Sequence, residues 1–329
     1  MKRALVTGIF GQDGSYLAEH LSGKNYEVHG IVRSRLSSQS SKLRTHLLQK
    51  GVTPIFHECD LSSFASVRDL MKDLRPDECY HLAAIHYSAQ TVFAEQFDND
   101  RYLLEQNILS VLNLLNAIRE VSSATRFVLA GSCVMYEDSG ISPQCESTPF
   151  RSNSVYGTSK IIGLQMTELF RNLYNLHVST AILYNHESPR REEHFVSQKI
   201  VKGLIKIKRN ETERLELGNL DDVKDWGFAR DYAYGMWLMA QAHSPGDYIL
   251  ATGTGHTVAD FVREAADALE LEKWPEVVTV QPRLTRPVTK TRLVGDPYRA
   301  QTALGWSHSL DFRGLVRLMV QHAATNTLD

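Results

Sequence analysis

The sequence predicts an α/β fold: a Rossmann-like, doubly wound parallel sheet followed by a smaller, mostly helical C-terminal part. Three observations lead to this prediction. Short apolar runs alternate with helical patterns through the first half of the 329-residue chain, as in parallel sheets whose strands are joined by helices. A glycine-rich turn follows the first apolar run, where such a strand passes sharply into a helix. The regular alternation stops after residue 183.

The expected strands are short and apolar, which is typical of strands buried on both faces. They cover residues 4–7, 28–32, 54–57, 78–82, 126–130 and 177–183. Helical spacing over residues 13–22 places Tyr16, Leu17 and Leu21 on one face. A second helical stretch covers residues 107–119. In chain order, the expected strands and helices therefore alternate.

The length indicates two structural parts around a large shared core. We expect residues 1–184 to form the cofactor-binding part and residues 185–329 the substrate-binding part. The chain shows no internal repeat and no linker-like composition between them. Segments such as 226–252 are therefore expected to return to the first part.

Composition excludes several classes of partner. The net charge is -2, with 43% hydrophobic and 22% charged residues, so nothing predicts binding to nucleic acid or to an anionic membrane. The most basic stretch, residues 202–209, alternates with apolar residues and is expected to be the solvated face of a helix. The four cysteines form no C-x-x-C pair, so we expect free thiols and no metal site. A cytoplasmic protein is the matching expectation.

The turn after the first strand predicts a dinucleotide site. Gly8, Gly11 and Gly14 have the spacing G-x-x-G-x-x-G, which lets backbone N–H groups approach a pyrophosphate at a helix N-terminus. Phe10, Gln12 and Asp13 belong to the same loop and are expected at the cofactor. A tight strand–helix turn alone could also require these glycines.

The end of the second strand favours NADP. Arg33, Ser34 and Arg35 stand where an acidic residue would bind the ribose hydroxyls of NAD, and they suit a 2′-phosphate. NAD stays open, because two surface arginines on a polar loop are the alternative. Asp60 and Leu61 are expected near the adenine, although Asp60 could instead cap a helix. Leu82, Ala83 and Ala84 complete the expected cofactor contacts.

Tyr156 and Lys160 are the most informative pair in the chain. Four residues apart on a helix, their side chains share a face and reach one point. A lysine ammonium beside a phenol lowers the pKa of the phenol, and such a tyrosine can exchange a proton with a sugar hydroxyl. Chance would produce this spacing in many helices. Its distance from the glycine loop, with Ser132 at the end of the intervening strand, makes chance a poor explanation.

At this point the sequence resembles the extended short-chain dehydrogenase/reductase family, and within it the GDP-mannose 4,6-dehydratases. The resemblance covers nearly the whole chain through the strings TGIFGQDG, NSVYGTSK, NHESPRR and LGNLDDVKDWG. It implies an acid/base role for Tyr156, a ribose-binding role for Lys160 and a hydroxyl-orienting role for Ser132. It also implies a nucleotide-sugar substrate, GDP-linked more readily than UDP- or CDP-linked. The substrate contacts expected on this basis are His86, Ser132, Asn185, Glu187, Arg191, Lys199, Leu217, Gly218, Asn219 and Arg286.

Several positions depart from that family. The dehydratases carry Thr-Ser-Glu after the fifth strand, and the glutamate, which removes the C5 proton of the sugar, corresponds to Val134 here. Cys133 is one residue earlier, and strand alternation predicts that it points away from the sugar. Replacement bases near in sequence are Glu137, Asp138, His86 and Glu187. His81 and His86 could equally be packed core or loop histidines. The Arg286 motif lacks the family's glutamate, which puts guanine specificity in question.

The sequence therefore favours an NADP-linked enzyme that oxidises C4 of a nucleotide sugar and then epimerises C4 or reduces a keto group. The alternative is a GDP-mannose 4,6-dehydratase-type lyase with a relocated base. A weaker alternative is a non-catalytic cofactor-binding regulator, for which Ser132, Tyr156 and Lys160 would be unnecessary. In the family the loop equivalent to residues 33–41 joins subunits. Its altered sequence here favours a homodimer over a tetramer.

Overall fold

The structure is a computed structural model, and it describes residues 1–32, 37–86, 96–281, 291–325 and 327–328. Four predicted site residues, Arg33, Ser34, Arg35 and Arg286, lie outside the described residues.

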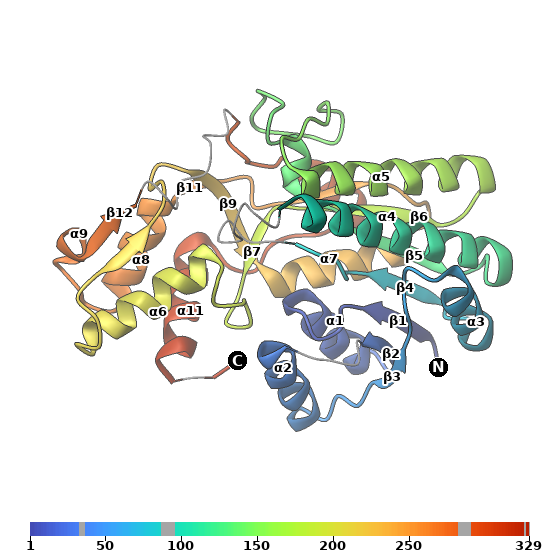
Figure 1. The fold of residues 1–329 in the computed structure, drawn as a ribbon, viewed down its shortest axis with the longest axis horizontal. Coiled ribbons are helices and arrows are strands. Elements are labelled where there is room, and N and C mark those ends of the chain that lie inside the picture. The colour runs from blue at the N-terminus through green and yellow to red at the C-terminus, as the bar shows by residue number, and fades with distance from the viewer. Residues whose placement is uncertain (33–36, 87–95, 282–290, 326, 329) are drawn as a thin grey trace.

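A seven-stranded parallel sheet forms the centre of the molecule (Figure 1). Its strands lie in the order β10, β6, β5, β4, β1, β2, β3, and every neighbouring pair is parallel. The bounds are β1 (Arg3–Thr7), β2 (Glu27–Val32), β3 (Ile55–Glu58), β4 (Glu78–His81), β5 (Arg126–Ala130), β6 (Val178–Leu183) and β10 (Tyr248–Leu250). The order reverses between β1 and β4, which defines the point where such sheets bind ligands. The predicted fold class is confirmed.

Helices cover both faces of this sheet (Figure 1). One face carries α1 (Gln12–Gly23), α2 (Ser38–Gln49) and α7 (Ala229–Gln241), with α1 packed on α7. The other carries α3 (Phe64–Leu74), α4 (Gln96–Val121) and α5 (Val155–Tyr174), with α4 between its two neighbours. Tyr16, Leu17 and Leu21 on α1 are fully or almost fully buried, as their helical spacing predicts. Ala4, Leu5 and Val6 of β1 have no exposed surface, because helices cover both sides of that strand.

The remaining elements form the smaller part, at the left of Figure 1. Its strands are β7 (Asn185–Glu187), β8 (Leu215–Leu217), β9 (Val223–Phe228), β11 (Gly255–Thr257) and β12 (Val278–Val280), paired as β11–β9–β7 and β12–β8. Its helices are α6 (Val196–Lys208), α8 (Val258–Ala268), α9 (Trp274–Val277) and α11 (Phe312–Thr325), whereas α10 (Tyr298–Leu304) packs on α7 and β10 of the large sheet. Helices α6, α8 and α11 pack on one another.

The chain returns to the large sheet after entering the smaller part. Helix α7 packs on α1, and β10 pairs with β6 as an additional parallel strand. Residues 229–250 are therefore built into the sheet layer. The division of the chain at residue 184 stays a prediction.

Two smaller expectations concern surface and cysteines. Residues 202–208 belong to α6, with Leu204 and Ile205 buried and Lys206 and Lys208 exposed, so this basic stretch is a solvated helix face. All four cysteines are free thiols. Among the described residues, no helix has both the length and the apolar character needed to span a membrane.

Candidate active site

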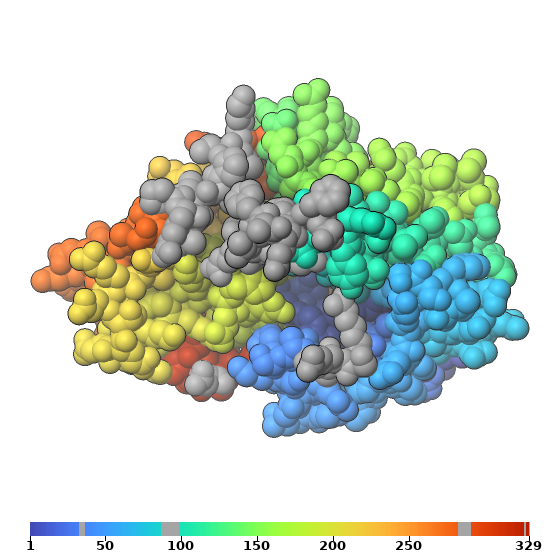
Figure 2. All heavy atoms as spheres, viewed as in Figure 1, coloured from blue at the N-terminus to red at the C-terminus, as the bar shows by residue number. Residues whose placement is uncertain are grey.

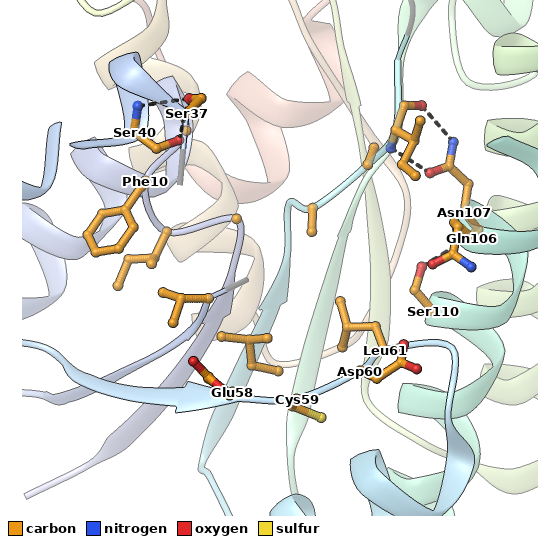
Figure 3. A pocket seen from close by; sticks show the side chains of 18 of the residues that line it. Phe10, Ser37, Ser40, Glu58, Cys59, Asp60, Leu61, Gln106, Asn107 and Ser110 are labelled. Atoms are coloured by element: carbon orange, nitrogen blue, oxygen red, sulfur yellow. Dashed lines mark hydrogen bonds between the residues drawn. The ribbon is translucent and has the colours of Figure 1, made fainter. Parts of the chain in front are cut away.

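A cleft of about 860 Å³ opens at the carboxyl ends of β1, β2, β3 and β4. Figure 2 shows the hollow on this face, with deep-blue N-terminal residues at its floor. In Figure 3, Ser37 and Ser40 lie at one end of the cleft and Asn107 and Ser110 at the other. The cleft has the position in which doubly wound sheets bind nucleotides.

The glycine loop forms the floor of the cleft through close backbone contacts. Gly8 has φ +71°, and a Cβ there would lie 3.0 Å from the backbone N of Ala83. A Cβ on Gly14 would lie 2.2 Å from the carbonyl O of Gly8. Gly8 and Gly11 line the cleft, and Gly11 is the N-cap of α1. The loop can therefore present unpaired helix N–H groups and a positive dipole end to a pyrophosphate.

Gln12 and Asp13 tie the glycine loop to β7. The Gln12 amide donates to the carbonyl O of His186 (3.0 Å) and accepts from the Ser188 hydroxyl (2.8 Å). Asp13 Oδ2 lies 2.9 Å from His186 Nε2. Burial alone would raise the pKa of the Asp13 carboxyl, but His186 and Arg191 lower it below its ordinary value. Burial would lower the pKa of His186, and Asp13 raises it instead. This ion pair joins the first turn of α1 to β7.

The wall of the cleft contains most of the other predicted cofactor residues. Phe10, Asp60, Leu61, Ala83 and Ala84 line it. The N–H groups of Leu82 and Ala83 donate to the Thr7 hydroxyl (3.1 and 3.0 Å), which also bonds His81 Nδ1 (2.8 Å). His81 is buried, and burial followed by the Lys160 charge lowers its pKa to about 3. It is a neutral core histidine.

Asp60 does not cap a helix. Its Oδ1 accepts from the N–H (2.9 Å) and hydroxyl (2.6 Å) of Ser62, and these bonds lower the pKa of its carboxyl. The cap of α3 is Ser63, whose hydroxyl accepts from the Ser66 N–H. The capping alternative is therefore wrong, and Asp60 lies exposed at the cleft.

Ser132, Tyr156 and Lys160 come from two adjacent segments. Ser132 follows β5 and caps a short 3₁₀ helix, η2 (Cys133–Tyr136), by accepting from the Val134 N–H. Tyr156 and Lys160 lie in the first turns of α5, which begins after the capping hydroxyl of Ser154. Lys160 Nζ lies 5.5 Å from the centre of the Tyr156 ring. Lys160 lines a small cavity that shares Ala83, Ala84 and Asn107 with the cleft lining.

The electrostatics of the pair differ from the expectation. Lys160 Nζ donates to the Ala130 carbonyl (2.7 Å), and burial lowers the pKa of its ammonium to about 8. Burial also raises the pKa of Tyr156 above its ordinary value, and the cation that opposes this is Arg191. The prediction that Lys160 lowers the pKa of Tyr156 is wrong for this geometry, because desolvation outweighs the attraction of a lysine bonded elsewhere.

Residues 133–136 are helical, which changes the argument about Cys133. Strand alternation cannot fix its direction, because Cys133 begins η2. Its thiol is buried and lies 4.0 Å from Asn185 Oδ1, and burial raises its pKa to about 12. The prediction that Cys133 points away from the sugar assumed a strand at this position, and that assumption is wrong. Val134, the position of the missing glutamate, is partly exposed.

The predicted substrate residues divide into two groups. His86 lies against Tyr156, with ring centres 4.6 Å apart and planes at 85°. Arg191 stacks over Phe195 at 3.5 Å, and its Nε lies 3.2 Å from Glu187 Oε2. Glu187 also accepts from the Ser197 hydroxyl (2.6 Å) and is 2% exposed. His86 and Arg191 therefore lie near Tyr156, and Glu187 is held within the protein.

The second group lies in the smaller part, away from the cleft lining. Asn185 begins β7, Lys199 lies on α6, and Leu217 is buried at the end of β8 next to Gly218. Asn219 bonds Asp222 Oδ1 (2.9 Å) and the Asp221 N–H (3.0 Å), so it shapes the turn into β9. Their substrate roles stay predictions.

The cleft also contains residues that the sequence argument missed. Asn107 Oδ1 accepts from the Ile85 N–H (2.7 Å), and its amide donates to the Ile85 carbonyl (3.0 Å). It thereby holds the segment that follows β4, immediately before His86. Ser37 and Ser40 line the cleft at the N-terminus of α2. The available signals were an asparagine at the start of the helical stretch over residues 107–119 and serines before a helix start.

The fold and this arrangement of serine, tyrosine and lysine define a class: the nucleotide-sugar-modifying enzymes of the extended short-chain dehydrogenase/reductase family. Solved structures support the fold. A dTDP-glucose 4,6-dehydratase from Bacillus anthracis, solved with NAD, superposes with a TM-score of 0.84 at 16% identity, covering 99% of this chain and 97% of the other. The RMD protein of Pseudomonas aeruginosa, solved with NADPH, gives 0.80 at 21% identity, covering 99% and 100%.

Sequence comparison narrows the class. The family model for GDP-mannose 4,6 dehydratase matches residues 5–319. GDP-mannose 4,6 dehydratase 2 of Arabidopsis thaliana is 39% identical over 97% of this chain and 86% of its own length. The Vibrio cholerae GDP-mannose 4,6-dehydratase is 34% identical over 97% and 93%. The chain belongs to the GDP-mannose 4,6-dehydratase family.

Proposed function

We propose that the protein binds NADP and a GDP-linked hexose, oxidises C4 of the sugar and eliminates water across C5 and C6. The observation that carries this proposal is Tyr156 beside Lys160 on α5, which packs against the 3₁₀ helix that Ser132 caps, with Lys160 lining a small cavity next to the dinucleotide cleft. Relatives that match 97% of the chain carry the name GDP-mannose 4,6-dehydratase, and this name supplies the GDP-linked substrate.

The chain's own groups can perform the first step. Tyr156 accepts the proton of the C4 hydroxyl while Ser132 orients that hydroxyl by hydrogen bonding. The charge of Arg191 opposes the effect of burial on the Tyr156 phenol, so it favours the phenolate that removes the proton. A nicotinamide bound in this cleft would supply the hydride acceptor for C4 and the hydride donor for a later step. Burial of Lys160 places its ammonium where water cannot compete for its donors.

The residues present fit a dinucleotide, and we propose NADP in particular. The glycine contacts leave no room for a Cβ at Gly14, as the close packing of helix on strand in a dinucleotide-binding turn requires. Ser37 and Ser40 can donate to a 2′-phosphate at the N-terminus of α2. Arg33 and Arg35 precede that helix.

The cofactor choice is tested by titrating the protein with NADPH and NADH and following nucleotide fluorescence. Replacing Arg33 and Arg35 by alanine should raise the Kd of NADPH by roughly 10- to 100-fold, as for lost charged hydrogen bonds, and leave that of NADH unchanged. Arg68→Ala on the surface of α3 is the control. Equal weakening for both nucleotides would reject the 2′-phosphate contact.

The reaction is tested by incubating the protein with GDP-mannose, and with UDP- and CDP-hexoses for comparison. Mass spectrometry should show a GDP-sugar lighter by one water, and NMR should show a C4 ketone with a C6 methyl group. Turnover of the UDP- or CDP-sugars alone would reject the GDP assignment. Binding of NADPH without turnover of any sugar would reject an enzymatic function.

A second candidate is C4 epimerisation, and the specific observation in its favour is Val134. A valine cannot remove the C5 proton, whereas epimerisation needs only hydride removal from C4, rotation of the keto sugar and hydride return. The same incubation separates the two, because the epimerase product has an unchanged mass and an inverted C4.

We also propose a homodimer. Tyr102 and Leu109 on α4, and Leu169, Leu173 and Tyr174 on α5, are large apolar residues with 36–64% of their surface exposed. Because α4 and α5 pack side by side, the pair offers a broad face to a second copy, and a four-helix contact would bury it.

A further inference from the structure

The dehydration that we propose lacks its usual base, so another side chain must remove the C5 proton. Of the four candidates near in sequence, two carboxylates are engaged inside the protein. Glu137 Oε1 accepts from the Ser152 hydroxyl and the Asn153 N–H, both at 2.7 Å. Glu187 is held by Ser197 and Arg191. Asp138 lies beyond η2, where its N–H donates to the Arg151 carbonyl (3.0 Å).

His86 is the candidate that packs on the catalytic tyrosine. Its ring centre lies 4.6 Å from that of Tyr156 and 6.1 Å from that of Phe195, nearly perpendicular to the first (85°) and nearly parallel to the second (21°). The imidazole therefore packs near both rings, and it is exposed. The hydrogen bonds between Asn107 and Ile85 fix the preceding residue, so the backbone that carries His86 is anchored.

In the proposed reaction the Tyr156 hydroxyl meets the C4 hydroxyl, and C4 is bonded directly to C3 and C5. A group packed against the Tyr156 ring, as His86 is, is therefore close to the carbons on either side of C4. Of these two carbons, C5 is the one that loses a proton in the proposed dehydration. A C4 ketone makes the C5 hydrogen acidic, and an imidazole is the side chain best suited to exchange such a proton near neutral pH.

We propose that His86 is the acid–base residue for C5 and C6, an inference that rests on the proposed dehydration. A neutral imidazole nitrogen takes the C5 proton, and the electron pair of the C5–H bond moves to form the C4 enolate. The enolate re-forms the ketone and a C5–C6 double bond as the C6–O bond breaks. The leaving hydroxide takes the proton from His86 and departs as water. Atoms and charges balance without another reactant.

A preformed ketone tests this role separately from C4 oxidation. The enzyme is incubated in D2O with GDP-4-keto-6-deoxymannose, and NMR follows deuterium entering C5. Wild type should exchange this hydrogen, and His86→Gln should slow the exchange by about 100-fold or more. His194→Gln is the matched control, because His194 packs on the same Phe195 ring at 4.3 Å without belonging to the proposed machinery.

The outcomes separate the two proposals. Exchange by His86→Gln at the wild-type rate, or no C5 exchange by wild type, would overturn the role of His86. Failure of wild type to form a 4-keto sugar from GDP-mannose would reject the proposed function instead. A double variant, His86→Gln with Val134→Glu, should regain C5 exchange because it restores a carboxylate base. No recovery, together with lost binding of GDP by His86→Gln, would show a structural role and reject the proposal.

Discussion

At the scale of single residues, burial has the largest effect on the chemistry of the site. Tyr156 and Lys160 share one face of α5, and desolvation disfavours the charged form of both. The pair therefore rests as a neutral phenol and a lysine whose pKa is about 8. Substrate and cofactor would have to supply the interactions that release Lys160 from the Ala130 carbonyl.

The first prediction concerns the phenolic hydroxyl. Tyr156→Phe should lower kcat for any C4 oxidation by a factor on the order of 100 to 10,000, because it removes the proton acceptor. The melting temperature and NADPH binding should stay close to wild type. Tyr174→Phe at the exposed end of the same helix is the control. A Tyr156→Phe enzyme with wild-type kcat would reject the acid/base role.

The second prediction concerns the free energy of unfolding that the protein loses by burying the Lys160 ammonium. Its ordinary pKa of 10.5 falls to about 8 in the folded chain, equivalent to about 3 kcal/mol. Lys160→Met should abolish activity yet raise the free energy of unfolding at pH 7 by about 2 kcal/mol, since the bond to Ala130 is also lost.

The pH dependence of this effect has a definite sign. Between pH 8 and 10.5 the unfolded lysine binds more proton than the folded one, so wild-type stability should rise with pH relative to the variant. Urea unfolding at pH 7 and pH 9.5 should show a smaller difference at the higher pH. A constant difference would mean that the folded Lys160 titrates normally.

At the scale of elements, the glycine loop and α1 form a unit whose close backbone contacts leave little space for an added side chain. Gly14→Ala places a Cβ against the Gly8 carbonyl, so we expect a loss of about 1–3 kcal/mol in unfolding free energy and weaker NADPH binding. Gly23→Ala, at the end of the same helix with open space around it, should change stability by less than about 0.5 kcal/mol. Chemical denaturation and fluorescence titration measure both. Equal effects of the two substitutions would contradict the close-approach argument.

Some secondary-structure elements could be predicted from the sequence and others could not. Short apolar runs predict every strand of the large sheet except β10. β10 has three residues, too few for a pattern. The prediction for the segment after Ser132 is wrong for another reason. The Ser132 hydroxyl caps η2, and this bond turns the chain where the argument from alternation assumes an extended strand. The contact of His86 with Tyr156 joins residues 70 positions apart, which local spacing cannot reveal.

At the scale of the whole molecule, the two faces of the sheet differ in how they meet solvent. Helices α3, α4 and α5 cover one face, and the last two expose large apolar side chains, including Leu169 at 50% and Leu173 at 64%. Arg119 of α4 stacks over Tyr174 of α5 at 4.7 Å, so the two helices are already fixed to each other. An association through this face therefore requires little reorganisation of either copy.

The last prediction follows from that face. Leu169 and Leu173 are four residues apart and share one side of α5. Replacing both by glutamate should convert a dimer into a monomer, because two copies would bury four carboxylates against apolar surface without partners. Sedimentation equilibrium measures the mass directly. Leu48→Glu on α2, where the leucine is 47% exposed, should leave the mass unchanged because α2 lies on the opposite face of the sheet. A wild-type chain that sediments as a monomer, or a double variant that stays dimeric, would move the interface elsewhere.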